Sequence, residues 1–308
     1  MSTWLTIHQF RSNWVVDAET GTYHANIPSP TGIASDPALA GYGVSQSHEL
    51  ANHLVTLDPP LEQFYSSPFY RCIQTIDPTL DLLEKNGGPT QKIRGDNGIG
   101  EWYGTARFDH PSPAKPELLN SLFPRYDREY TPTIIPSVNG ESIADLHDRI
   151  AYALHKIIER SDKEGVKAII ICSHAASILA IGRALTGRMP DDIEEQDFRP
   201  FTCGLSKFVR KSLDAHKDVP AWKEGDDIPR ISWTGGAGVG GGWKCEINGD
   251  CSFLSGGEER GWRFSGDESF IAGATLTTKD TSELGVVVEP EAKPHIERRS
   301  TTEGASRL

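Results

Sequence analysis

The chain has 308 residues, a formal net charge of -12 and a pI near 5.3. This length allows one large α/β domain or two small ones, with enough apolar material for a core. The acidic balance argues against direct nucleic acid binding, or attraction to an anionic membrane, as the main role. A small anionic ligand therefore requires a local basic pocket.

The expected compartment of the protein and the redox state of its cysteines follow from sequence signals that we do not find. Five cysteines include no C-x-x-C pair, and two lie in apolar runs, so we expect buried, reduced thiols. We find no N-x-[ST] acceptor, no basic-then-apolar leader and no apolar run of the roughly 18 residues that cross a bilayer. We expect a soluble protein of the cytoplasm, the nucleus or both, with no membrane partner.

Apolar spacing in the first third of the chain predicts strands alternating with helices. The expected elements are a strand over 4–8, a long loop over 17–41, a helix over 43–57, a strand over 63–66 and a helix from Pro68. Pro78 should kink or interrupt that helix, because proline removes a backbone donor. Long loops in compact domains are often functional.

The remainder continues the pattern around an irregular segment. Residues 94–136 are rich in glycine, proline and aromatics and suggest a cap inserted over a site. After it we expect an amphipathic helix over 141–160, a strand buried on both faces over 166–172, a helix over 175–185 ending at Gly187, and a strand over 204–209. Strands over 243–247 and 252–254 should form a hairpin around Asn248 and Gly249.

The domain prediction is one domain over 1–276, with the cap at 94–136 and a hairpin extension at 243–264. The composition of residues 277–308, poor in apolar side chains, predicts a disordered tail.

The chemically informative residues fall at strand ends. In a doubly wound sheet, ligands bind beyond the carboxyl ends of the strands, and His8, Arg71 and His174 all lie there. His174 also opens a helix, whose free N–H groups favour an anion. Arg11 can supply a guanidinium fork for phosphate oxygens. These positions predict a phosphate site.

Glu101 is the candidate proton donor, because it lies beside Trp102 and Tyr103 and partial burial would raise its pKa. Simpler interpretations remain open for single residues. His8 alone is compatible with an ordinary strand-end histidine, Arg71 with a helix surface, and Glu101 with a charge on a loop.

Ordered motifs carry a resemblance to a known family. Asp36, Leu39, Gly43 and Gln46 resemble a D-x-x-L-x-x-x-G-x-x-Q segment, and residues 67–75 resemble S-P-x-x-R-x-x-x-T. With Glu141-Ser142 and Ser173-His174 they are similar in order to the histidine phosphatase superfamily, which includes phosphoglycerate mutases. The resemblance implies a three-layer α/β fold with a mostly parallel central sheet, and transfer of a phosphoryl group to a histidine and then to water or another hydroxyl.

Carried over residue by residue, the resemblance implies catalytic roles for His8 as nucleophile, Glu101 as proton donor, and His174. Arg11, Arg71 and His174 would bind the phosphoryl group of a phosphorylated small molecule or phosphoprotein. The family's first strand reads R-H-G, whereas Ile7 and Gln9 flank His8 here. Loss of a guanidinium that stabilises the transition state costs on the order of a thousandfold in rate.

A narrower likeness runs through residues 10–14, 98–103 and 174–177 and the late stretch 248–259. These segments resemble a fungal subgroup that contains the histidine-phosphatase-like subunit of the RNA polymerase III factor TFIIIC. Three functions follow: a phosphomonoesterase acting through phosphohistidine, a catalytically degenerate interaction module that partners TFIIIC subunits, and, as a weaker alternative, a mutase-type phosphotransferase.

No cofactor or metal is expected. Six further histidines have no ligand spacing and are interpreted as surface or helix positions: His24, His48, His53, His110, His147 and His155. The glycines at 236, 238 and 241 match G-x-G-x-x-G, but a strand follows them where a dinucleotide site needs a helix.

Overall fold

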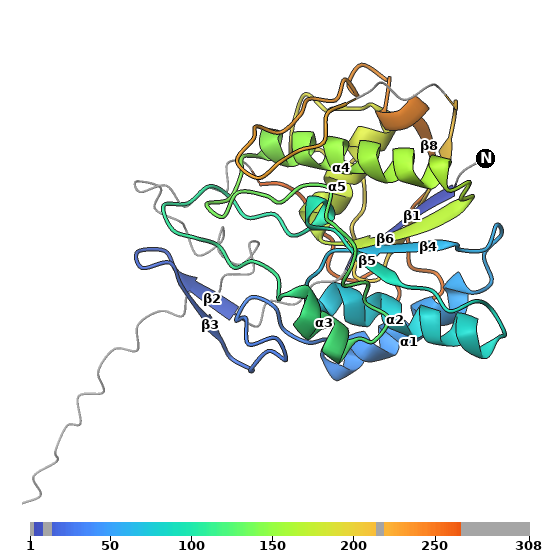
Figure 1. The fold of residues 1–308 in the computed structure, drawn as a ribbon, viewed down its shortest axis with the longest axis horizontal. Coiled ribbons are helices and arrows are strands. Elements are labelled where there is room, and N and C mark those ends of the chain that lie inside the picture. The colour runs from blue at the N-terminus through green and yellow to red at the C-terminus, as the bar shows by residue number, and fades with distance from the viewer. Residues whose placement is uncertain (1–2, 9–13, 214–218, 266–308) are drawn as a thin grey trace, which may run out of the picture.

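A six-stranded sheet organises the protein (Figure 1). The computed structural model describes the backbone of residues 3–8 and all of residues 14–213 and 219–265. The sheet has the order β5-β4-β6-β1-β7-β8, in which β5, β4, β6 and β1 run parallel and β7 and β8 are antiparallel to their neighbours. The strands are β1 (Thr3–His8), β4 (Gln63–Ser66), β5 (Ile93–Gly95), β6 (Ala168–Ser173), β7 (Leu205–Arg210) and β8 (Trp243–Asp250).

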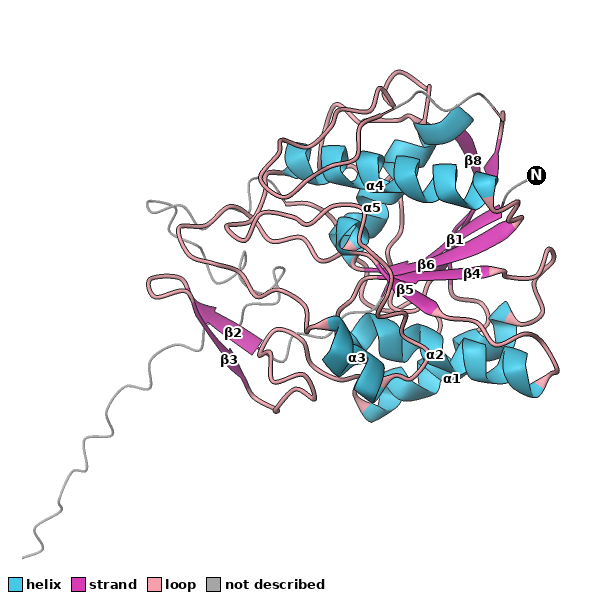
Figure 2. Ribbon diagram, viewed as in Figure 1, coloured by secondary structure: helices cyan, strands magenta, loops and turns pink. Residues whose placement is uncertain are grey.

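Helices cover both faces of this sheet (Figure 2). On one face lie α1 (Gly41–Leu54), α2 (Tyr70–Lys85) and the short α3 (Pro116–Leu122); on the other lie α4 (Ile143–Lys163) and α5 (Ala175–Thr186). Single turns of 3-10 helix span Asn97–Ile99 and Val239–Gly241. The predicted three-layer α/β architecture with a mostly parallel sheet is confirmed.

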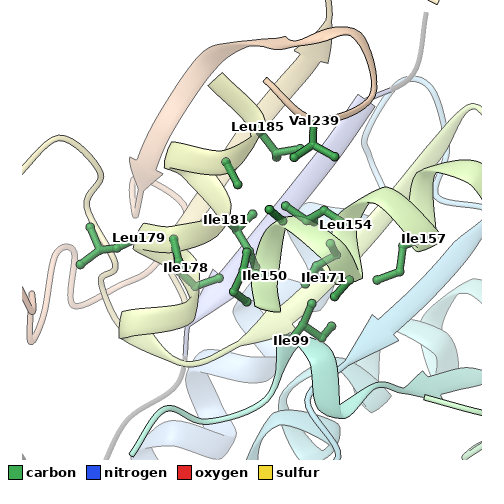
Figure 3. Close-up of a cluster of buried hydrophobic side chains, with 14 of the residues drawn as sticks. Ile99, Ile150, Leu154, Ile157, Ile171, Ile178, Leu179, Ile181, Leu185 and Val239 are labelled. Atoms are coloured by element: carbon green, nitrogen blue, oxygen red, sulfur yellow. The ribbon is translucent and has the colours of Figure 1, made fainter. Parts of the chain in front are cut away.

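Strand β6 shows why the sheet is buried on both faces. Ile169 and Ile171 pack into a core with α4 and α5, whereas Ile170 and Cys172 pack into a second core with α1 and α2. Figure 3 shows Ile171 among the side chains of the first core. Successive side chains of a strand point to opposite faces, so an all-apolar strand supplies both cores. The prediction from the apolar run at 166–172 is confirmed.

Two helix termini on this side follow from local chemistry. Ser142 caps α4: its hydroxyl accepts from the Asp145 N–H at 3.1 Å, and the Asp145 carboxylate accepts from the Ser142 N–H at 3.2 Å. This capping box starts the helix two residues later than predicted. Helix α5 ends as predicted at Gly187, whose φ of 80° is a left-handed conformation that favours glycine.

Pro78 was predicted to kink or interrupt its helix; the interruption is wrong, because α2 runs without a break from Tyr70 to Lys85. Ile73, Ile76 and Leu80 on this helix are buried in the core. Their burial stabilises the helix by more than the one backbone hydrogen bond that proline removes. The helix also begins at Tyr70 and not at Pro68.

Three strands of the structure were not predicted. Strand β2 (Trp14–Asp17), which ends at the first residue of the predicted loop, and β3 (Thr22–Ala25), which lies within that loop, form a small antiparallel sheet, and the turn between them uses Gly21 at a φ of 69°. The first residues of the predicted cap segment belong to β5, which adds an edge to the main sheet beside β4. A strand of three residues is too short for a pattern to reveal.

The predicted hairpin turn at Asn248 and Gly249 is wrong, since both residues lie inside β8. Strand β8 pairs with β7, and the register shifts by one residue between Leu205 and Lys207. Gly249 has a φ of 68° and its N–H donates to the Ser206 hydroxyl at 2.9 Å. The left-handed glycine thus makes a β-bulge within a strand, which requires the same residue type as a tight turn.

Some predictions are not tested by the described part of the structure. Gln9, Arg11 and the tail over 277–308 lie outside the described residues. The domain boundaries at 1–276, 94–136 and 243–264 stay predictions.

Candidate active site

The carboxyl edge of the parallel strands brings the predicted residues together. Strand β1 pairs with β6 so that His8 is opposite Ser173, and His174 is the next residue. Strand β4 ends at Ser66, opposite Cys172, and Arg71 follows in the first turn of α2. Parallel strands end on the same edge, so the backbone of His8 and the side chains of Arg71 and His174 share one region.

Arg71 lies at the centre of this edge, with only 7% of its side chain exposed. Its Nη2 donates to Glu101 Oε2 at 2.6 Å, and its Nη1 donates to the carbonyl oxygen of Ser35 at 2.9 Å. The Asp36 carboxylate lies 3.6 Å from the same Nη1. Two carboxylates and a carbonyl therefore hold the guanidinium in one orientation.

His174 is buried beside Arg71 and Glu101. Its Nε2 lies 2.7 Å from the Ser67 hydroxyl, and its Nδ1 lies 3.0 Å from Glu101 Oε2. Burial alone would lower the His174 pKa, but the Cys72 sulfur and the Glu101 carboxylate outweigh it and raise the pKa to about 9. A protonated imidazole donates from Nδ1 to Glu101, so the 3.2 Å separation from Arg71 Nη2 is a close approach of two donors.

Glu101 carries a negative charge in this arrangement. Burial alone would raise its pKa, but His174 and Arg71 together outweigh burial and lower the pKa to about 2. The prediction that burial would raise this pKa is therefore wrong for the site as it stands. The prediction considered only the aromatic residues next to Glu101. Arg71 and His174, which come from other elements of the fold, determine its charge.

The loop that carries Glu101 is fixed from three directions. The Ser173 hydroxyl donates to the Ile99 carbonyl at 2.5 Å, and the Ser177 hydroxyl donates to the Gly100 carbonyl at 2.6 Å. Arg149 of α4 donates to the Gly98 carbonyl at 3.0 Å. These bonds satisfy buried carbonyl groups and hold the Glu101 carboxylate against Arg71.

Glu141, which lies in one of the motifs that resemble the family, supports the candidate site indirectly, through Arg149. Its carboxylate accepts from Arg149 Nε at 2.8 and 3.0 Å, and both side chains are buried. Because Arg149 holds the loop before Glu101, Glu141 supports the site through another residue.

Sequence reasoning missed four residues around the site: Ser35, Ser67, Cys72 and Tyr103. Ser67 and Cys72 contact His174, and Ser35 contacts Arg71 through its backbone carbonyl. Tyr103 donates its hydroxyl to Ser35 Oγ at 3.1 Å, and Cys72 Sγ lies 3.6 Å from His174 Nε2. Ser67 and Cys72 fall inside the S-P-x-x-R-x-x-x-T segment over 67–75, so the motif was a signal for them. Nothing in the local pattern distinguished Ser35.

The comparisons with known proteins identify the family. The sequence model described as the histidine phosphatase superfamily (branch 1) matches residues 21–216, which is more than half of the chain. The chain belongs to the histidine phosphatase superfamily. The matched range starts after β1, so His8 and its neighbours Ile7 and Gln9 lie before it.

Curated relatives of this chain include a transcription factor subunit and a phosphatase. The Saccharomyces cerevisiae transcription factor tau 55 kDa subunit is 34% identical over 306 residues, which cover 94% of this chain and 64% of the yeast protein. The Drosophila melanogaster ecdysteroid-phosphate phosphatase is 28% identical over 168 residues, covering 54% of this chain and 22% of that protein. The chain thus spans less than two thirds of either relative.

Solved structures are similar to this chain at lower sequence identity. The ecdysone phosphate phosphatase of the silkworm, in complex with tungstate, has a TM-score of 0.49 and 18% identity over 68% of this chain and 89% of that one. A phosphoglycerate mutase from Bacillus anthracis has a TM-score of 0.43 and 15% identity over 82% and 94% of the two chains.

Other predictions about polar residues can be compared with the structure. His110 was interpreted as a surface or helix position, which is wrong: it is buried in a loop, where Nε2 lies 2.8 Å from the Gly104 carbonyl and Nδ1 lies 2.6 Å from the Tyr23 hydroxyl. All five cysteines lie within the described residues, none forms a disulfide bond, and four of them are buried. Within the described residues, no three His, Cys, Asp or Glu side chains form a cluster that could hold a metal ion, and no helix is long and apolar enough to cross a bilayer.

Proposed function

We propose that this member of the histidine phosphatase superfamily is a nuclear protein and a subunit of a transcription factor. Its yeast relative is named as a transcription factor subunit. The observation that carries the proposal is identity of 34% across 94% of the chain. That span extends beyond residues 21–216, which the family model matches. An acidic chain is also better suited to contacts with protein subunits than to DNA.

Assembly is tested in the source organism with a tagged full-length chain at its native level. We expect the other subunits of the factor related to tau to co-purify in fixed proportion, and the chain to be nuclear by fluorescence. A His8→Ala variant should assemble equally, because assembly does not need chemistry at the strand edge. A chain that purifies without those subunits would refute the role.

A second function, hydrolysis of phosphomonoesters, is supported by the contacts among Arg71, Glu101 and His174. In this proposal Arg71, His174 and Arg11 bind the phosphoryl group and His8 attacks phosphorus. The bond from phosphorus to the leaving oxygen breaks, and that oxygen takes a proton from Glu101. Water then attacks the phosphohistidine, giving inorganic phosphate and free His8.

A proton on Glu101 requires that its low pKa change when substrate binds. Arg71 and His174 are the cations that lower it, and a phosphoryl dianion would compete for both. The carboxylate would then keep its burial penalty and gain a negative neighbour, and each of these raises its pKa. Substrate binding itself would thus favour the protonated form of Glu101, which can act as the proton donor.

Ile7 is the main argument for the degenerate alternative. It lies one residue before the end of β1, where the resemblance calls for an arginine, and it pairs in register with Cys172. Without that guanidinium the expected rate is lower by on the order of a thousandfold. Mutase-type transfer to a second hydroxyl remains the weaker alternative.

The chemistry is tested by comparing wild type, His8→Ala and Ile7→Arg on a generic aryl phosphate. Turnover in wild type that disappears in His8→Ala supports hydrolysis through His8. Turnover confined to Ile7→Arg indicates a site that retains its other groups but lacks the arginine. Absence of turnover in all three folded proteins contradicts hydrolysis and favours the interaction module.

A further inference from the structure

A groove of about 740 Å³ lies against the first two turns of α4, between two loops that are far apart in the sequence. One wall is the segment 134–141, which leads into α4, and the other is the segment 222–230. We call this hollow the α4 groove. Arg71 and His174 do not line it, so it is separate from the candidate phosphate site.

Hydrogen bonds to α4 hold the outer wall of the groove in place. The Tyr152 hydroxyl donates to the Pro220 carbonyl at 3.1 Å and accepts from the Trp222 N–H at 2.7 Å. Trp222 Nε1 in turn donates to the Asp226 carbonyl at 3.0 Å and closes the turn that follows. The wall is therefore ordered before a partner arrives, which lowers the entropic cost of binding.

Large apolar side chains line the groove and are only partly covered. Ile135 and Val138 each leave 47% of their surface exposed. Trp222 and Ile228, on the opposite wall, are half-buried. Exposed apolar side chains that gather in one hollow are typical of a surface that another molecule covers.

The lining also carries an excess of negative charge. Two arginines and six acidic residues line the groove, the latter being Glu141, Asp145, Asp148, Glu224, Asp226 and Asp227. The buried pair of Glu141 and Arg149 is neutral, which leaves five carboxylates against Arg230. Within the described residues, no hydrogen bond or ion pair occupies the carboxylate of Asp148 or Glu224. A cationic partner would complement this surface.

Asp148 shows that the charge is not compensated within the chain. Burial raises its pKa; Arg230 lowers it, and the neighbouring Asp145 raises it again, so that the pKa lies above its usual value. The ionised carboxylate is therefore less stable in the folded protein than in the unfolded chain. A basic side chain that a partner places against Asp148 would stabilise the ionised form.

We propose that the α4 groove binds a segment of a partner subunit that carries both basic and large apolar side chains. The basic side chains pair with the carboxylates of Asp148 and Glu224, and the apolar ones pack on Ile135 and Val138. A second copy of this chain is a poorer occupant, because each copy has a net charge of -12. The inference rests on the proposed role as a subunit.

Fluorescence anisotropy with a labelled synthetic peptide tests the groove on the full chain. The probe peptide repeats Arg, Leu and Ser; one control peptide has Glu in place of Arg, and a second has Ser in place of Leu. Wild type should bind the probe about tenfold more tightly than either control peptide, because each control lacks one half of the complementarity. Equal binding of the probe and either control peptide would overturn the proposal.

A double variant places the binding in the groove. Asp148→Asn with Glu224→Gln should weaken binding of the probe about tenfold. It should fold, because burial disfavours the charge on Asp148 and Glu224 is exposed. The matched control, Asp191→Asn with Glu19→Gln, removes the same net charge from exposed positions outside the groove and should bind the probe as wild type does. Equal weakening in both would show attraction to the whole chain and overturn the groove.

Co-purification of the tagged full chain separates this inference from the subunit role. Loss of the other subunits from the groove variant, but not from the matched control, supports the groove as the docking site. If wild type and both variants retain those subunits equally, the groove is overturned and the subunit role stands. If wild type purifies alone, the subunit role fails and the inference fails with it.

Light scattering tests the other occupant. Wild type should be monomeric at the concentrations used for anisotropy. A wild-type dimer that the groove variant abolishes would show that a second copy fills the groove, and would overturn the partner segment.

Discussion

Replacing Glu101 by glutamine keeps the shape of the side chain and removes the charge that faces Arg71 and His174. The carboxylate lies 2.6 Å from Arg71 Nη2 and 3.0 Å from His174 Nδ1, and its side chain is 19% exposed. Burial alone would raise the Glu101 pKa, but these two cations lower it from 4.5 to about 2. The ionised form is therefore bound more tightly in the folded protein than in the unfolded chain.

The size of the effect follows from linkage. The change in the Glu101 pKa from 4.5 to about 2 on folding corresponds to roughly 3 kcal/mol of folding free energy at pH 7. A lowered carboxyl pKa stabilises fully above the unfolded value of 4.5, and this stabilisation is lost as the pH falls through about 2. At a pH of about 3.5, roughly 2 kcal/mol should remain.

Urea unfolding of wild type and Glu101→Gln at these two pH values measures the difference directly. Glu129→Gln serves as the control, because Glu129 is 77% exposed and pairs with its neighbour Arg128 on the surface. The control should change stability by less than about 0.5 kcal/mol. Equal stability of Glu101→Gln and wild type at neutral pH, or a gap that does not shrink in acid, would refute the reasoning.

Buried charge and glycine conformation offer further tests. Arg149→Met leaves the buried Glu141 carboxylate without its cation, and thermal unfolding should show a loss of roughly 3–5 kcal/mol; a loss under about 1 kcal/mol would contradict the pair's importance. Gly187→Ala should destabilise more than Gly165→Ala by chemical denaturation. Both glycines have positive φ, but a Cβ at 187 would lie 2.6 Å from backbone atoms, whereas none lies within 4 Å at 165. Equal losses would show that contact with the neighbouring loop is unimportant.

Much of the fold was predictable because burial leaves a periodic trace in a sequence. The apolar run that became β6 predicted a strand between two helical layers, and its residues fill both cores. The placement of Arg71 and His174 just after their strands predicted their meeting at one edge. The carboxyl ends of parallel strands lie at the same edge of the sheet, whatever the conformation of the loops between them.

Local patterns failed where one residue type serves two geometries. Asn248 and Gly249 have the composition of a hairpin turn, but pairing with β7 makes them a bulge inside β8. Pro78 is a helix breaker by propensity, but the packing of α2 against the sheet retains the helix. In each case long-range contacts outweighed a local preference.

By itself, the sequence determined the layered α/β fold, the family, and the edge at which Arg71 and His174 lie. The succession of strands and helices along the chain and the spacing of apolar residues can both be read from the sequence. Only the tertiary structure decided the charge on Glu101 and the groove beside α4. The first depends on cations that α2 and the end of β6 bring within 3 Å of one carboxylate, and the second on two loops that lie far apart in the sequence. Electrostatic energy depends on distance in space, which a sequence read in order does not contain.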